Sequence, residues 1–271
     1  MIKNKLSVVL ATHNEASNLP RCLESIKDLA DEIIVVDGQS TDETVAIAKK
    51  YGARVISTTN KLNFHINKQM GLDQAKGELV LQLDADEVVD QALAKFITGL
   101  KKAAWVKKIN QKIARDSDHP VAWWLKRKNL FLGTWLKKGG QYPDPVIRLY
   151  INGYARLPQK SVHEQMKVDG LVGWAKGHLL HYSNPTFSDY LRKFNTYTSF
   201  TAKTWFDQGI KPSFGFGLKN YFFTPLQTFF TLYLRHKGFM DGKAGFVFAL
   251  MSGLHYPFAY LKLWELYETK T

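Results

Sequence analysis

Apolar runs of strand length alternate with segments of helical pattern over the first third of the chain. Short connections between such elements favour parallel strands joined by right-handed crossovers. The sequence therefore predicts an α/β fold with a mainly parallel sheet flanked by helices. The expected strands are Leu6–Ala11, Glu32–Asp37, Arg54–Ser57 and the apolar run within Glu78–Glu87 that ends at Asp84. The expected helices are Ala16–Leu29, a segment from Ser40 or Thr41 (the expected N-cap) to Gly52, and Phe64–Ala75.

Acidic residues follow three of the four expected strands. Glu15 lies after the first strand, Asp37 closes the second, and Asp84 and Asp86 follow the fourth. Ligands of open α/β sheets bind beyond the carboxyl ends of strands, and paired carboxylates suit a divalent cation that carries phosphates. An Asp-x-Asp pair alone also fits an acidic surface turn. Because all the acids belong to one expected sheet edge, we favour a binding site there.

The net charge indicates what kind of partner the protein binds, and the cysteine content and the N-terminal segment indicate its cellular compartment. The net charge of +13 calls for a negative partner, which nucleic acid, anionic lipid or a phosphorylated substrate would supply. Cys22 is the single cysteine, so an internal disulfide is impossible and a reducing cytoplasm is expected. The apolar run in Met1–Leu10 is too short for a signal peptide and lacks a cleavage site.

The alternation of expected strands and helices ends after Leu100. Further strands are expected over Ala122–Leu132 and Val146–Tyr150, with Trp123 and Trp124 on opposite faces of the first. From about residue 185 the sequence becomes rich in aromatic residues, with expected helical segments at 187–205 and 214–234. We therefore expect a catalytic domain over 1–184 and a helical extension over 185–271.

The segment Ala244–Leu261 is nearly uncharged but contains Gly253, His255 and Pro257. Its length borders on that of a membrane span, whereas broken apolar segments with aromatic residues and flanking lysines more often lie in the membrane interface. Three interpretations stay open: an interfacial helix or hairpin, a core or oligomer contact, and a true span.

Three N-terminal motifs resemble the nucleotide-sugar motifs of family-two, inverting glycosyltransferases of GT-A (Rossmann-like) fold. They are Ser7-Val-Val-Leu-Ala-Thr-His-Asn-Glu15, Val35-Val-Asp-Gly-Gln-Ser-Thr-Asp42 and Leu83-Asp-Ala-Asp-Glu87. Later motifs resemble the bacterial branch that adds glucose to the lipopolysaccharide inner core, whose close relatives act on other surface glycans. These motifs are Ile147-Arg-Leu-Tyr150, Val162-His-Glu164, Leu180-His-Tyr-Ser183 and Gly238-Phe-Met-Asp-Gly242.

The resemblance implies roles at the strand ends. The uridine of the donor would lie against Asp37 and the loop that contains Thr12, Asn14 and Glu15. A carboxylate at Asp37 can accept an N–H of the base; the alternative is an acid that caps the following helix.

A divalent metal, Mn²⁺ or Mg²⁺, would neutralise the diphosphate leaving group. The resemblance places Asp84 towards the ribose and metal, and Asp86 as a metal ligand. His181 is the candidate for a further ligand, with a structural histidine as the alternative. Lys68 could contact phosphate, although a solvated lysine is the simpler interpretation. Arg148 could bind an acceptor phosphate or pair with Asp144.

Inversion of the anomeric carbon requires a base on the face opposite the leaving group. The resemblance places this base at Glu164. The family often has Glu-Asp at this motif, whereas this chain has His163-Glu164, so His163 is a rival base or a sugar-binding neighbour. A surface ion pair is the alternative role for Glu164.

The predicted function is metal-dependent transfer of a hexose, glucose from UDP-glucose, onto a lipid-linked or lipopolysaccharide-core acceptor. The protein would lie in the cytoplasm on the inner face of the membrane, in peripheral contact with anionic lipid. A polyprenyl-phosphate acceptor is an alternative, but such enzymes favour a definite pair of transmembrane helices. A nucleic-acid-binding protein would need a stripe of basic residues, whereas the basic residues of this chain are spread out. A nucleotidyltransferase would need a glycine-rich phosphate loop near the N-terminus, whereas Leu10–Glu15 contains no glycine.

Overall fold

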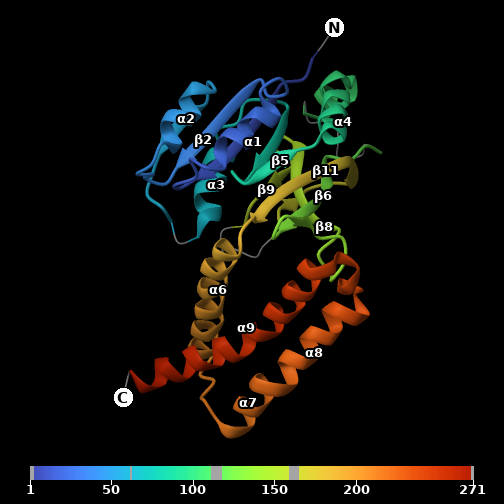
Figure 1. Cartoon of the computed structure of the whole chain (residues 1–271). Coiled ribbons are helices and arrows are strands. Elements are labelled where there is room, and N and C mark those ends of the chain that lie inside the picture. Colours follow the sequence, from blue (N-terminus) through green and yellow to red (C-terminus); the bar gives the residue numbers. More distant parts are fainter. Residues whose placement is uncertain (1–2, 62, 111–117, 159–164, 270–271) are drawn as a thin grey trace. The chain divides into compact units, whose positions relative to one another are not determined.

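The computed structural model describes residues 3–61, 63–110, 118–158 and 165–269. The chain divides into two compact units (Figure 1). The first unit contains residues 1–127 and 144–181, and the second contains residues 128–143 and 182–271. The short segment 128–143 therefore belongs with the C-terminal helices, and each unit is described by itself below.

The main sheet has nine strands in the order β3-β2-β1-β4-β8-β6-β11-β5, with β7 paired to β6. The strands β3, β2, β1 and β4 are parallel, which confirms the predicted α/β arrangement of this half. The sheet as a whole is mixed, because β8 pairs antiparallel with β4 and β6 pairs antiparallel with β8. The strands of this sheet are β1 Leu6–Thr12, β2 Glu32–Asp37, β3 Arg54–Ser57, β4 Leu79–Leu83, β5 Glu87–Val89, β6 Ala122–Phe131, β7 Thr134–Trp135, β8 Asp144–Ile151 and β11 Val172–Asn184. A separate pair consists of β9 Ala155–Arg156 and β10 Lys167–Val168.

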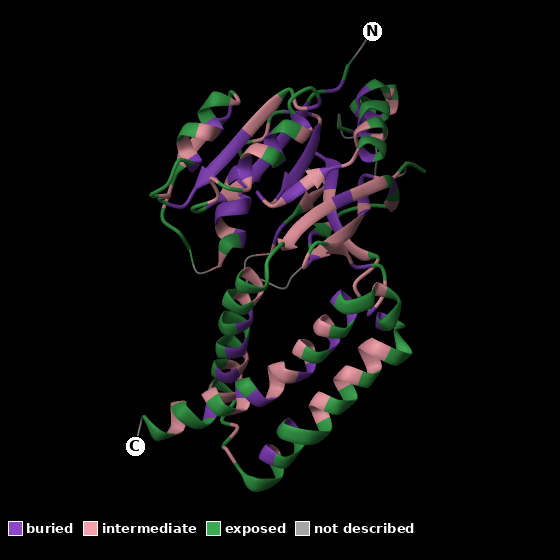
Figure 2. Cartoon of the chain, viewed as in Figure 1, coloured by how far each residue is buried: buried purple, intermediate pink, exposed green. Residues whose placement is uncertain are grey.

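Helices cover both faces of the sheet in the first unit. Successive side chains of a strand point to opposite faces, so neighbouring residues of β1 belong to two different cores. Val8 of β1 belongs to the cluster that contains the inward residues of α1 and α4, whereas Val9 packs with Leu72 of α3. Figure 2 shows the central strands as buried. The helices of this unit are α1 Leu19–Ile26, α2 Thr44–Lys50, α3 Phe64–Leu72, α4 Gln91–Lys102 and α5 Ala104–Lys108.

Two local predictions can be compared directly with these elements. Trp123 and Trp124 belong to different hydrophobic clusters, as expected for neighbours on opposite faces of β6. The predicted start of the second helix at Ser40 or Thr41 is wrong, because α2 begins at Thr44. The Ser40 hydroxyl instead donates to Asp37 Oδ1 over 2.6 Å, which holds this segment as a loop.

The second unit is built mainly from helices, along which Figure 2 shows many exposed residues. Many of these exposed residues are aromatic, such as Phe214, Phe222 and Phe223. Helix α9 packs with α6 and α8. Its Lys262 ammonium lies 2.7 Å from both Asn195 Oδ1 and Thr198 Oγ1 of α6. In the described part of the chain, the segment Gly238–Glu268 alone is long and apolar enough to cross a membrane. The elements are α6 Phe187–Asp207, α7 Phe214–Leu218, η3 Lys219–Phe223, α8 Thr224–Phe230, η4 Thr231–Arg235, η5 Gly238–Asp241 and α9 Gly242–Glu268.

Candidate active site at the strand ends

The loops after β1 and β2 are joined by hydrogen bonds between backbone and side chains. Asn14 has a left-handed backbone, with φ of 56°, which asparagine adopts more readily than most residues. Its Oδ1 accepts from the Thr41 amide over 2.8 Å, and its own amide donates to Ser40 Oγ over 2.8 Å. The Glu15 amide donates to Thr44 Oγ1 over 2.8 Å. The structure therefore brings Asn14 and Glu15, which follow β1 and are predicted to lie near the uridine, against the loop after β2.

Asp37 is buried at the end of β2 and organises the loop that follows it. Its Oδ2 accepts from the Ser40 amide over 3.0 Å, and its Oδ1 lies 3.4 Å from Thr12 Oγ1. These bonds give Asp37 a structural role within a loop and do not place it at the N-cap of α2. Its contact with a nucleotide base stays a prediction.

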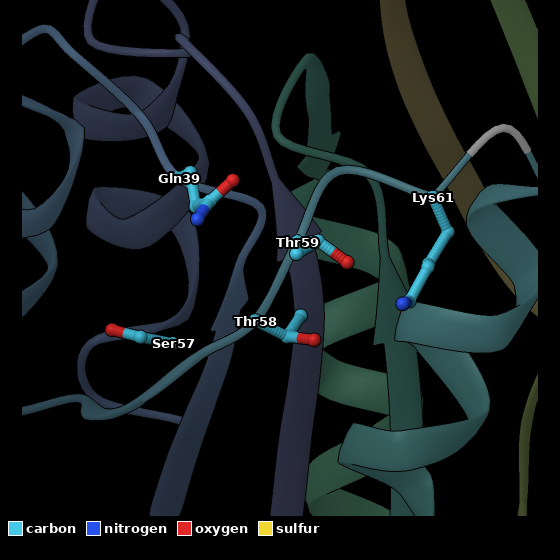
Figure 3. A pocket seen from close by; sticks show the side chains of 5 residues that line it. All are labelled: Gln39, Ser57, Thr58, Thr59 and Lys61. Carbon is cyan, nitrogen blue, oxygen red and sulfur yellow. The ribbon is translucent and has the colours of Figure 1, made fainter.

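A cavity of about 330 Å³ lies next to these loops. Figure 3 shows that the side chains around it come from the loop after β2, from the last residue of β3 and from the segment that follows β3. The backbone is tightly packed beside the cavity, since a Cβ on Gly38 would lie 3.1 Å from the Cα of Asn60. Sequence reasoning did not single out these lining residues, of which only Gln39 lies in a quoted nucleotide-sugar motif, because isolated polar residues in a loop have no periodic pattern. They are Gln39, Ser57, Thr58, Thr59 and Lys61.

Asp84, at the end of β4, is held by two cations. Its Oδ1 pairs with Lys68 Nζ, and its Oδ2 lies 2.7 Å from Arg148 Nη2. Lys68 is only 5% exposed, so the interpretation as a solvated lysine is wrong. The alternative pairing of Arg148 with Asp144 is not found among the described contacts, in which Asp144 pairs with Arg127 over 2.7 Å.

Burial and neighbouring charges shift the pKa values of Asp84, Lys68 and Arg148 in opposite directions. Burial favours the neutral form of Asp84, but the positive charges of Arg148 and Lys68 hold its pKa well below the ordinary value. Burial lowers the pKa of Lys68, and Asp84 opposes that change. For Arg148, burial is outweighed by Asp84 and Glu87, so its pKa is raised. The mutual attraction of these groups therefore favours their charged forms near neutral pH.

Glu87 supports this arrangement from within the core and is fully buried, with 0% exposure. Its Oε2 accepts from the Asp84 amide over 2.9 Å, and its own amide donates to the Asp84 carbonyl over 2.9 Å. Its Oε1 lies 3.4 Å from Arg127 Nη1 and 3.7 Å from Arg148 Nη2. The carboxylate therefore fixes the turn that carries Asp84 and Asp86.

Asp86 and His181 lie together at the same edge. His181 Nε2 is 3.3 Å from Asp86 Oδ2. The short strand β5, which the sequence did not predict, explains this proximity because His181 of β11 is paired with Glu87 of β5. A carboxylate beside an imidazole suits Mn²⁺ or Mg²⁺ only as part of a larger ligand set.

The three predicted metal ligands do not form one cluster in the described residues. Within these ranges, no group of three or more His, Cys, Asp or Glu side chains is placed to hold a metal ion. Asp86 and His181 lie close enough together to contribute two ligands to a larger set, whereas both oxygens of Asp84 contact cations. The predicted base, Glu164, and its rival His163 lie outside the described residues.

Comparisons with known proteins relate this chain to sugar-transferring enzymes. The family model "Glycosyl transferase family 2" matches residues 7–156. The lipopolysaccharide core biosynthesis glycosyltransferase LpsC of Rhizobium meliloti (strain 1021) is 31% identical, over 94% of this chain and 90% of that protein. An uncharacterized glycosyltransferase of Rickettsia felis is 28% identical, over 98% of this chain and 90% of that protein.

A solved structure also aligns with the chain. It is glucosyl-3-phosphoglycerate synthase from Mycobacterium tuberculosis, in complex with Mn²⁺, uridine diphosphate and glucosyl-3-phosphoglycerate. The sequence identity is 19%, the TM-score is 0.45, and the alignment covers 78% of this chain and 82% of that chain.

Proposed function

Because the chain belongs to glycosyl transferase family 2, it is a glycosyltransferase, and we propose that it transfers glucose from UDP-glucose to a lipopolysaccharide-core or other lipid-linked acceptor. The observation that carries the proposal is the convergence of polar residues at the carboxyl ends of β1, β2 and β4. This is where an open α/β sheet binds its ligand.

The nucleotide would bind at the end of β1 and β2. The cavity beside Gln39 and Thr59 supplies space next to Asp37, and amide and hydroxyl groups there can hydrogen-bond a base or ribose. The loop that forms the cavity is anchored, because the Asn67 side chain donates to the Thr59 carbonyl over 3.0 Å. A fixed pocket of this kind favours binding because little conformational freedom is lost when the ligand enters.

The diphosphate would lie near Lys68 and Arg148. The Arg148 Nε is buried and has no hydrogen-bond partner in the described part of the chain. A buried donor without a partner is costly, and a phosphate oxygen would satisfy it. Both cations can therefore exchange part of their interaction with Asp84 for the negative charge of the donor.

Asp86 and His181 would hold the divalent metal. A bound Mn²⁺ or Mg²⁺ stabilises negative charge on the diphosphate as the glycosidic bond breaks. Asp84, already close to two cations, would orient the donor through Lys68 and Arg148. For transfer with inversion, Glu164 would take the proton of the acceptor hydroxyl, with His163 as the rival.

The second unit would lie on the inner face of the membrane, where a lipid-linked acceptor is found. The relative LpsC is named for lipopolysaccharide core biosynthesis, which supports an acceptor of this class. Helix α9 is bound to α6 by Lys262 and by His255, whose Nε2 lies 2.9 Å from Thr201 Oγ1. These polar contacts favour an interfacial position over a lone membrane span, in which they would be lost.

A donor screen tests the proposed function. Purified full-length protein is incubated with a panel of nucleotide sugars, with Mn²⁺, with Mg²⁺ and with chelator, and free sugar is measured. We expect hydrolysis of UDP-glucose that depends on the metal, and faster turnover when a lipopolysaccharide-core acceptor is added. If polyprenyl phosphate, and not the lipopolysaccharide-core acceptor, speeds turnover, the acceptor belongs to the polyprenyl-phosphate class. Full hydrolysis in chelator would remove the metal roles of Asp86 and His181.

A further inference from the structure

The motif Gly238-Phe-Met-Asp-Gly242 forms a turn that binds the segment 136–140 inside the second unit. Asp241 Oδ2 accepts from the backbone amides of Lys137 and Lys138, over 3.0 and 2.8 Å. The Gly139 amide donates to the His236 carbonyl over 2.9 Å. These hydrogen bonds hold two lysines of one segment beside the residues that precede the motif.

Close backbone packing explains the glycines of this turn. A Cβ on Gly238 would lie 2.7 Å from the Leu232 carbonyl oxygen, and a Cβ on Gly245 would collide with the Gly238 carbonyl. Lys237, just before the motif, has a left-handed backbone with φ of 58°. The turn is therefore a defined structure, in which the positions of the exposed side chains are fixed by the backbone.

The side chains around the turn are strongly basic. Asp241 is the one acid between Asp207 and Glu265, and the segment 128–143 contains none. The carboxylate of Asp241 accepts from backbone amides, and no ion pair to the basic side chains is found in the described ranges. We name this set the basic turn patch; it consists of Lys137, Lys138, Arg235, His236, Lys237 and Lys243.

Large apolar side chains are exposed within the same turn. Phe239 is 49% exposed and Met240 is 59% exposed, and both lie between the cations on either side in the sequence. Leu234 and Phe246 add exposed apolar surface nearby in the sequence. Cations that flank an apolar tip are typical of segments that lie in the membrane interface, where the cations bind headgroups and the tip enters the acyl boundary.

We propose that the basic turn patch binds an anionic phospholipid bilayer, with Phe239 and Met240 inserted below the headgroups. Both side chains of the tip offer apolar surface that a bilayer can bury, whereas only the Phe239 ring could stack on a base, so the pair suits a bilayer better than nucleic acid. The proposal rests on the proposed function and deepens it, because it identifies the part of the second unit that contacts the membrane.

Vesicle sedimentation of the full-length protein tests this proposal. Vesicles of phosphatidylcholine and phosphatidylglycerol in equal parts are compared with vesicles of phosphatidylcholine alone. The variants are Arg235→Glu/Lys237→Glu, which reverses charge, and Phe239→Ser/Met240→Ser, which removes the apolar tip. The matched control is Lys49→Glu/Lys50→Glu, which makes the same charge change at exposed positions of α2.

We expect binding to anionic vesicles alone, and a loss of at least about twentyfold in affinity for the charge-reversal variant, since each cation near the surface contributes several-fold. The apolar-tip variant should also bind weakly, at any salt concentration, whereas the control should change little. Unchanged binding in both patch variants, or an equal loss in the control, would overturn the proposal. Metal-dependent hydrolysis of UDP-glucose without vesicles, measured in every variant, reports the proposed function separately and shows that each variant is folded.

Discussion

Glu87 is the residue on which the geometry of the strand-end site depends most directly. It is buried without solvent contact, yet it accepts from the Asp84 amide and lies near two arginines. A buried carboxylate is tolerated when cations and hydrogen bonds compensate for its lost hydration. Its role is therefore to position Asp84 and Asp86, and it does not need to contact substrate.

We predict that Glu87→Gln lowers the free energy of unfolding by about 3 kcal/mol, because Arg127 and Arg148 lose a buried counter-charge. Urea denaturation of the purified variant measures this loss. Glu24→Gln is the matched control, since Glu24 pairs with Lys27 on the surface and such exposed pairs contribute little. Equal stability of the Glu87 variant and the wild type would show that the buried network is dispensable.

Glu164 and His163 are rival candidates for the base that takes the proton of the acceptor hydroxyl. We expect Glu164→Gln to abolish sugar transfer and to keep UDP binding, because only proton removal from the acceptor is lost. The comparison variant is His163→Asn, which should retain transfer. Both are measured as acceptor-dependent turnover and as UDP affinity by calorimetry. Full transfer by the Glu164 variant, with loss in the His163 variant, would assign the base to His163.

Some of these residues were predictable from the sequence and others were not. Asp84 and Asp86 directly follow an apolar run, so their position at the carboxyl end of a strand was enough to predict that they lie in a binding site. The burial of Lys68 was not visible, because α3 presents mainly polar residues such as Asn67 and Gln69 to the interior. When a helix buries polar residues and the next strand ends in acidic residues, as α3 and β4 do, the two features together indicate a site with buried ion pairs like that around Asp84.

At the scale of elements, helix α3 brings Lys68 to Asp84 by packing unusually close to the sheet. A Cβ on Gly71 would lie 2.6 Å from Val9 Cγ1 and 2.9 Å from Val36 Cγ2. Cβ atoms in folded proteins do not approach other atoms so closely, so the helix requires glycine at this position. The distance between α3 and the sheet therefore links the packing of the core to the geometry of the site.

We predict that Gly71→Ala destabilises the protein by about 1–3 kcal/mol through overpacking, and that it weakens UDP binding by displacing Lys68. Gly99→Ala in α4 is the control, because nothing lies within 4 Å of its Cβ position. That change should stabilise the protein by about 0.5–1 kcal/mol, since alanine favours a helix. Thermal unfolding compares the two, and a Gly71 variant as stable as the Gly99 variant would contradict the packing argument.

The elements also show where local patterns stop being informative. Strands β1, β2 and β4 follow from apolar runs, because most residues of each are buried between the two faces of the sheet. The edge strand β3 is only half-buried, and it was predicted from its short apolar pattern alone. Strand β5 was missed because it has only three residues and is specified by pairing with the distant β11. The start of α2 was misplaced because Ser40 bonds to Asp37 and Asn14 in a loop, a tertiary arrangement that a capping pattern does not reveal.

For the whole molecule, the aromatic content after residue 185 was sufficient to predict a separate helical unit, and the negative partner expected from the net charge stays a prediction. The basic turn patch concentrates positive charge around a single acid, Asp241, whose carboxylate binds backbone amides. The sequence alone did not predict that residues 128–143 belong with the C-terminal helices. This association depends on contacts such as the hydrogen bond from the Lys137 amide to Asp241, two residues that are separated by about a hundred residues of chain.

We propose that the carboxyl edge of the parallel strands binds the UDP part of the donor, and that Asp86 and His181 contribute ligands to the metal. Calorimetric titration of UDP, in Mn²⁺ and in chelator, tests it in the wild type, in Asp86→Asn and in the surface control Asp28→Asn. We expect the wild type and the control to bind UDP alike in Mn²⁺, and Asp86→Asn to bind at least about tenfold more weakly. Equal UDP affinity in all three proteins, or no UDP binding by the wild type, would contradict the account.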